Sequence, residues 1–86
     1  MDIEFDLAKD EKNIADHGLS FVNFMGFDAE PVIVTDDRFD YGEVRYRAFG
    51  RIGGKGHCVV FTMRGEMMRL ISFRRAREKE MRRYGT

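Results

Sequence analysis

Arginines recur at alternate positions in the segment 45–52, which reads RYRAFGRI. Successive side chains of a β-strand point to opposite faces, so Arg45, Arg47 and Arg51 are predicted to share one face of a sheet. Each guanidinium can donate paired hydrogen bonds to phosphate oxygens, so a line of them suits the backbone of a nucleic acid. A solvated sheet face without any ligand would have the same pattern.

A second group of cations lies in the last predicted strand, directly after it, and at the start of the last predicted helix. It comprises Arg69, Arg74, Arg75 and Arg77. If Gly65 and Glu66 form a two-residue turn, the predicted cross-strand pairs are Met63 with Met68, Phe61 with Leu70, Val59 with Ser72, and His57 with Arg74. An imidazole beside a guanidinium suits RNA cleavage, in which a base takes the ribose 2′-hydroxyl proton and a cation stabilises charge on the phosphate. A lone histidine in a strand can equally be structural.

Polar residues also recur at helical spacing near the N-terminus. Lys9, Asn13 and His17 stand four residues apart and are predicted to form one polar stripe on a helix. A cationic imidazole at that helix end would alternatively complement the helix dipole. Tyr84, on the last predicted helix, could stack on an unpaired base or donate to a phosphate, or it could dock the helix on the sheet.

Other catalytic motifs are missing from the sequence. It has no glycine-rich phosphate loop, no zinc-ligand spacing and no nucleophile elbow. Its single cysteine, Cys58, lies in an apolar run and is predicted to be a small buried residue without a disulfide. We therefore expect no cofactor and no metal.

The net charge of zero conceals two oppositely charged halves. Residues 1–43 hold twelve acids and three bases, a net of −9, whereas residues 44–86 hold three acids and twelve bases, a net of +9. Such asymmetry favours a polyanionic partner such as nucleic acid, or an acidic protein that covers the basic half. The alternative is that the halves fold face to face and partly neutralise each other.

The predicted elements give an α+β fold in one domain, residues 1–86. Leu7 and Ile14 lie on the apolar face of the first helix, and Phe21 and Phe24 belong to the core. The predicted strands are 2–5, 32–35, 45–52, 57–63 and 67–74, mostly antiparallel, and the predicted helices are 7–16, 21–27 and 76–84. No apolar run could span a bilayer and no signal peptide is evident, so we expect a cytoplasmic protein without a membrane partner.

Motifs distributed along most of the chain resemble the BrnT toxin family. The matching pieces are Phe5-Asp6 with Lys9 and Asn13, then His17–Phe21, Asp28 with Pro31, Arg45-Tyr46 with Gly50, Thr62–Arg64, and Arg69–Ala76 with Glu80 and Tyr84. Phe5 stands where the family commonly has tryptophan and Phe73 where a small residue is usual. Both are apolar replacements that leave the fold expectation intact.

The resemblance implies a RelE-like ribonuclease toxin of a type II toxin–antitoxin system. Such a toxin cleaves RNA, inhibits translation and growth, and is neutralised by a cognate DNA-binding antitoxin, BrnA, with which it represses their operon. The RelE-like fold implies a site on the concave sheet face and the last helix. The candidate catalytic residues are therefore Arg47, Arg51, Arg69, Arg74, Arg77 and Tyr84, with His17 and Lys9 as acid–base partners.

Two other functions fit the same basic half. A non-catalytic module could use it to bind a partner protein, and an RNA-binding protein could use it without cleaving the RNA. RNA binding without turnover would weaken steeply with salt while the RNA stays whole.

Overall fold

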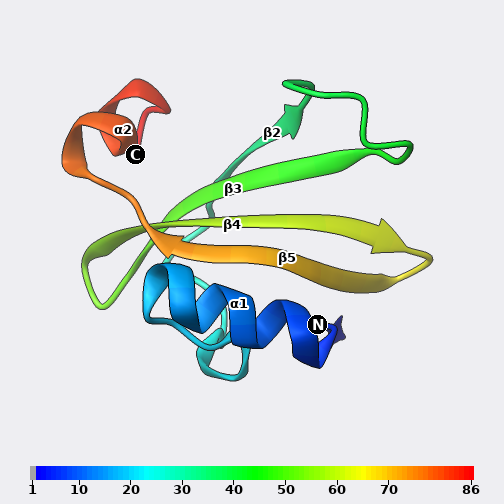
Figure 1. Cartoon of the computed structure of the whole chain (residues 1–86). Coiled ribbons are helices and arrows are strands. Elements are labelled where there is room, and N and C mark those ends of the chain that lie inside the picture. Colours follow the sequence, from blue (N-terminus) through cyan, green and yellow to red (C-terminus); the bar gives the residue numbers. More distant parts are fainter. Residues whose placement is uncertain (1) are drawn as a thin grey trace.

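A computed structural model describes residues 2–86, which form a five-stranded mixed sheet, two α-helices and one short 3₁₀ helix (Figure 1). In chain order the elements are β1 (Ile3–Glu4), α1 (Leu7–His17), η1 (Phe21–Asn23), β2 (Val32–Asp36), β3 (Arg45–Ile52), β4 (Lys55–Arg64), β5 (Met67–Arg75) and α2 (Glu78–Arg83). The predicted α+β class is confirmed, and strand β3 has the predicted bounds.

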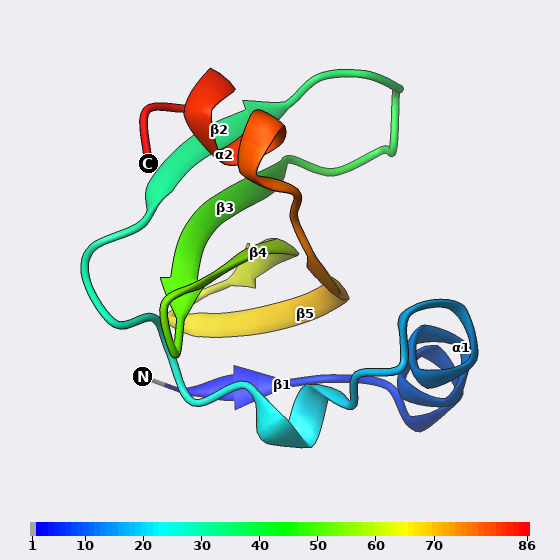
Figure 2. The ribbon, with the colours of Figure 1, turned by 90° about the vertical axis from the view of Figure 1, so that its left-hand side faces the viewer.

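The strands follow the order β1-β5-β4-β3-β2 across the sheet. Strand β1 pairs parallel with β5, and the other neighbours pair antiparallel, so the sheet is mostly antiparallel as predicted. Figure 2 shows α1 beyond the β5 side of the sheet and α2 next to β2 and β3. No helix within residues 2–86 is long and apolar enough to cross a membrane.

The second helix is much shorter than predicted. Ser20 caps it as expected, by accepting a hydrogen bond from the Val22 amide, but η1 ends at Asn23. Phe24 is already extended, and Gly26 has a φ of 100°, which a continuing right-handed helix cannot contain. The prediction of 21–27 as a helix is therefore wrong in length, although Phe21 and Phe24 are buried as expected.

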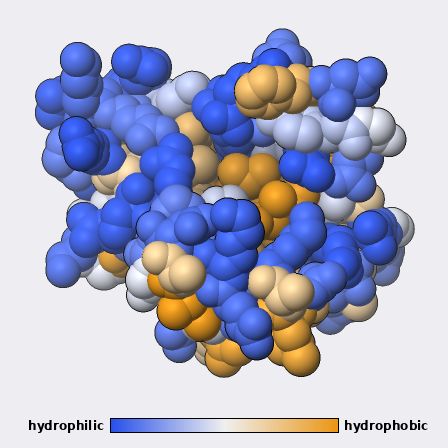
Figure 3. Space-filling view, in the orientation of Figure 1, coloured by the Kyte–Doolittle hydropathy of each residue, from blue (hydrophilic) through white to orange (hydrophobic). Residues whose placement is uncertain are grey.

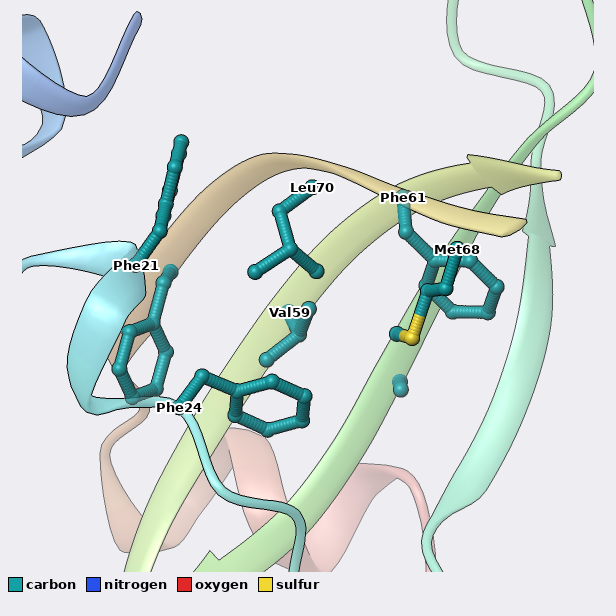
Figure 4. Close-up of a cluster of buried hydrophobic side chains, with 8 residues drawn as sticks. Phe21, Phe24, Val59, Phe61, Met68 and Leu70 are labelled. Atoms are coloured by element: carbon teal, nitrogen blue, oxygen red, sulfur yellow. The ribbon is translucent and has the colours of Figure 1, made fainter. Parts of the chain in front are cut away.

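An apolar cluster lies on each face of the sheet. The first lies under η1 and contains Phe21, Phe24, Ala48, Val59, Phe61, Met68, Leu70 and Phe73 (Figure 4). The second lies under α2 and contains Phe49, Cys58, Val60, Ala76 and Met81, with Val34, Ile71 and Tyr84 packed against it. Burial raises the pKa of the Cys58 thiol to about 11, which fits the predicted structural role.

Helix α1 presents its polar side, not its apolar side, to the rest of the protein. Leu7 is 74% exposed and Ile14 is 45% exposed, whereas Asp10 and Asn13 are buried. Asp10 accepts hydrogen bonds from the Ser20 hydroxyl and from the Phe21 amide, at 3.0 and 2.7 Å. Polar contacts to the chain after the helix therefore decide which side of α1 faces inward.

A β-bulge between Val60 and Phe61 shifts the register of β4 and β5. Below the bulge the predicted pairs of Met63 with Met68 and Phe61 with Leu70 are confirmed. Beyond it the predictions are wrong by one residue. Ser72 pairs with Val60 and Arg75 pairs with His57.

Candidate nucleic-acid interface

The side of the sheet that carries α2 gathers several basic and aromatic side chains. We call it the α2 face. Strand β3 contributes Arg47, Phe49 and Arg51, whose alternation places them on one side, and β5 contributes Arg74. Figure 3 shows a hydrophobic patch in a hollow at the middle of the molecule, beside α2, with hydrophilic residues around it. The predicted sharing of one face by the β3 arginines is thus consistent with the tertiary structure.

Arg47 is the half-buried cation at the centre of this face. Its guanidinium carbon lies 5.5 Å from the ring centroid of Tyr84 and 5.6 Å from that of Phe49. Its Nε is buried and makes no hydrogen bond, and within residues 2–86 its guanidinium forms no ion pair. An unpaired buried donor is costly, and the charge of this half-exposed guanidinium is available to attract an anion from solvent.

Arg74 lies on the same face but has a carboxylate partner. Its two terminal nitrogens donate to both oxygens of Glu80 on α2, at 2.6 and 3.1 Å. This bidentate pair raises the pKa of Arg74 and lowers that of Glu80. The hydrogen bond from Arg74 is the main cause of the lowered pKa of Glu80, and the positive charge of Arg47 adds to it.

Arg51 ties the C-terminal segment to the β3–β4 hairpin. It donates to both carboxylate oxygens of Glu78, at 2.8 and 3.0 Å, and to the backbone oxygens of Gly54 and Thr86. The hydrogen bonds from Arg51 lower the pKa of Glu78. This arginine is therefore already committed to holding α2 in place.

Tyr84 docks the end of α2 on the sheet. Its ring stacks on Phe49 with centroids 3.9 Å apart and planes 8° apart, and it packs against the second apolar cluster. Of the two roles that the sequence allowed, docking is the one seen. The ring also forms one wall beside Arg47, so it positions that guanidinium.

The remaining predicted arginines lie away from Arg47. Arg69 faces Glu4 across the β1–β5 pair, 3.5 Å from its carboxylate. Arg77 is exposed at the N-cap of α2. The structure thus groups Arg47, Arg74 and Tyr84, attaches Arg51 at the α2 end, and places Arg69 and Arg77 toward the margins.

His57 does not lie beside Arg74, contrary to the predicted register. The bulge places His57 opposite Arg75 and Cys58 opposite Arg74. The imidazole is 6% exposed, contacts the backbone oxygen of Lys55 through Nδ1, and lies 5.6 Å from the Phe73 ring. It is buried on the side of the first apolar cluster, as a structural histidine would be.

Lys9 and His17 line a second hollow, between α1 and β5. Its volume is about 320 Å³, and it is lined by Lys9, Lys12, Asn13, Asp16, His17, Ile71 and Ser72. The side-chain amide of Asn13 donates a hydrogen bond to the backbone carbonyl of Phe73 in β5. Lys12 forms an ion pair with Asp16 at 2.7 Å. Ile71 also packs against the second apolar cluster with Tyr84, so this hollow adjoins the α2 face.

Face-to-face neutralisation of the two halves is limited. Of the ion pairs within residues 2–86, Arg45 with Glu43 and Arg69 with Glu4 join the halves. Arg51 and Arg74 pair instead with glutamates of α2, inside the basic half. Most cations of the basic half are therefore not locked against the acidic half.

Sequence reasoning missed three residues of the interface. Glu80 holds Arg74, Phe49 supports both Arg47 and Tyr84, and Lys12 lines the second hollow. The strand alternation that linked Arg47 with Arg51 also includes Phe49, so that signal was present. No sequence pattern indicated that Glu80 would reach Arg74. Residues 2–86 contain no group of three His, Cys, Asp or Glu side chains placed to hold a metal ion.

The sequence was compared with those of known proteins and protein families. No curated protein sequence matches the chain. Residues 5–80 match the family described as "Ribonuclease toxin, BrnT, of type II toxin-antitoxin system", a match that includes Arg47, Arg74 and the second hollow but ends before Tyr84. The chain therefore belongs to the BrnT family of ribonuclease toxins, and this membership implies an antitoxin partner.

Proposed function

We propose that this protein is a metal-independent endoribonuclease that cleaves messenger RNA on the α2 face. The observation that carries the proposal is Arg47, a half-buried guanidinium beside the stacked rings of Tyr84 and Phe49 that forms no ion pair within residues 2–86. A phosphate diester would supply the negative charge that this guanidinium lacks. The partly apolar surroundings strengthen that electrostatic interaction relative to water.

In the proposed reaction the ribose 2′-oxygen attacks the adjacent phosphorus, and the bond from phosphorus to the 5′-oxygen breaks. The 2′-hydroxyl gives its proton to a base, and the departing 5′-oxygen receives a proton from an acid. The products are a 2′,3′-cyclic phosphate and a free 5′-hydroxyl. Arg47 and Arg74 stabilise the charge on the phosphate, and His17 and Lys9 in the adjoining hollow are the acid–base partners.

The other predicted residues have supporting roles in this proposal. Tyr84 positions Arg47, and Arg51 secures α2 through Glu78. Arg69 and Arg77 attract the flanking phosphates of the strand. A mostly antiparallel sheet with a C-terminal helix packed on one face also supports the predicted kinship with RelE.

We further propose that the protein acts in the cytoplasm, where loss of messenger RNA inhibits translation and arrests growth. Its antitoxin is a DNA-binding protein of the BrnA type, and operator DNA is contacted only through that antitoxin. Family membership supports a toxin–antitoxin pair. Acting on ribosome-bound RNA is compatible with the same chemistry.

Purified protein in excess EDTA tests the reaction directly. We expect cleavage of an RNA oligonucleotide to cyclic-phosphate ends, and no cleavage where the scissile ribose is replaced by 2′-deoxyribose. Arg47→Ala should lower kcat/KM by about 100-fold. Arg64→Ala, an exposed cation near the β4–β5 turn, serves as the control. Wild-type activity in Arg47→Ala, or a requirement for metal, would contradict the mechanism.

Expression of the toxin alone in a bacterium separates the enzyme from the non-catalytic alternatives. An active ribonuclease should stop growth and deplete messenger RNA, and Arg47→Ala should restore both. Normal growth with intact RNA would favour a binding module.

A further inference from the structure

The two edges of the sheet differ in how far their backbone groups are covered. At one edge β1 covers the first part of β5, and the Asn13 amide hydrogen-bonds the backbone of Phe73 further along the same strand. At the other edge, β2 pairs with β3 and with no other strand of residues 2–86. Its outer side therefore presents backbone donors and acceptors that a further strand could pair with.

An apolar hollow of about 420 Å³ adjoins this open edge. It is lined by Phe24, Gly26, Phe27, Ala29, Pro31, Ile33, Ala48, Phe61, Met63 and Met68. Phe61 and Met68 form the end of the first apolar cluster that lies nearer β2 (Figure 4). Ile33 of β2 is 54% exposed and Met63 is 45% exposed, so apolar surface continues from the hollow to the strand edge.

The charges at the two ends of β2 indicate what kind of strand could pair with its open edge. Exposed Glu30 precedes the strand, and exposed Asp37 and Asp40 follow it. Two copies of this chain paired antiparallel through β2 would bring the Glu30 end of one strand beside the Asp37 end of the other. Like charges disfavour that pairing, whereas a strand with basic flanks would be attracted.

We propose that the open edge of β2 and the hollow beside it are a docking site for the antitoxin. An extended segment of the antitoxin pairs with β2, places an apolar side chain in the hollow, and sets basic residues against the acids at the strand ends. This inference rests on the antitoxin partnership of the proposed function. The site lies on the face opposite Arg47, because Ala48 and Phe61 belong to the cluster on the side away from α2.

Binding of the purified cognate antitoxin to toxin variants tests the site. Ile33→Arg changes an exposed side chain at the edge of the hollow and should raise the Kd for the antitoxin by about tenfold or more. Leu7→Arg, an even more exposed apolar residue on α1, is the matched control and should bind like the wild type. Amide exchange in residues 32–36 should slow when the antitoxin is added.

Equal weakening by Leu7→Arg, or unchanged exchange in residues 32–36, would overturn the assignment. So would a free toxin that dimerises through β2 and becomes monomeric in Ile33→Arg, because the occupant would then be a second copy. RNA cleavage by Ile33→Arg is measured separately and should match the wild type. If the wild-type protein does not cleave RNA, the nuclease mechanism is refuted. The binding measurements would still test the docking site, because they do not depend on cleavage.

Discussion

The carboxamide of Asn13 on α1 makes with Phe73 of β5 the two hydrogen bonds that a neighbouring strand would make. Its Nδ2 donates to the Phe73 carbonyl at 2.8 Å, and its Oδ1 accepts from the Phe73 amide at 3.0 Å. The same Nδ2 donates to the carbonyl of Leu19. One side chain thereby occupies the edge of β5 at Phe73 and fixes α1 against that strand, and α1 and β5 together line the second hollow.

Replacement of Asn13 should therefore destabilise the protein strongly, although most other residues of α1 are exposed. Asn13→Ala leaves the buried amide and carbonyl of Phe73 without partners, which should lower the free energy of unfolding by about 2–4 kcal/mol. Urea denaturation followed by circular dichroism measures the change. Asn23→Ala, at the exposed end of η1, is the control, and an equal effect of the two substitutions would contradict the edge-closing role.

Tyr84 is expected to act through its ring and not through its hydroxyl. Tyr84→Phe retains the stack on Phe49 and should keep both stability and RNA cleavage near the wild-type level. Tyr84→Ala removes the stack and should cost about 1–2 kcal/mol of unfolding free energy, with reduced cleavage because Arg47 loses a wall. A large fall in kcat for Tyr84→Phe at unchanged stability would instead make the hydroxyl a participant.

Glu80 restrains Arg74, so removal of its charge should strengthen RNA binding. In Glu80→Gln the side chain keeps its size, and Arg74 gains the freedom to contact a phosphate. The dependence of log K on log salt should steepen by about one counterion for a 2′-deoxy-substituted, uncleavable RNA. Glu66→Gln, in the exposed β4–β5 turn, should leave affinity and salt dependence unchanged. Weaker binding by Glu80→Gln would show that this carboxylate supports the interface.

Asp36 should make stability depend on pH in the acidic range. Its buried carboxylate accepts hydrogen bonds from Arg38 and Tyr41, and the Arg38 hydrogen bond holds the pKa of Asp36 well below its ordinary value. Because the folded pKa is lowered, this contribution is complete above the unfolded value of about 3.9 and is lost as the pH falls below it. Asp36→Asn should cost about 2 kcal/mol at pH 7. The difference from wild type should shrink below about pH 4 in acid-series denaturation, and a constant difference would exclude this ionisation as its source.

Most of the local structure could be predicted from residues that are close together in the chain. Asp6 and Gly18 bounded α1 because a side-chain acceptor begins a helix and a left-handed glycine ends one. Alternation placed the β3 arginines on one face, and motifs distributed along the chain identified the family that residues 5–80 match. These features depend on residues close together in the chain or on recognisable motifs.

Contacts between residues that are distant in the chain could not be predicted, because they depend on how the elements pack. The bulge at Val60 moved His57 away from Arg74, since one extra residue shifts every later pair of the ladder. Asn13 and Asp10 turned the polar side of α1 inward against its hydrophobic pattern, because buried backbone groups of β5 and η1 needed partners. Glu78 pairs with Arg51 and Glu80 pairs with Arg74, whereas Arg47 has no ion pair among residues 2–86. Which arginines are paired depends on where α2 packs on the sheet.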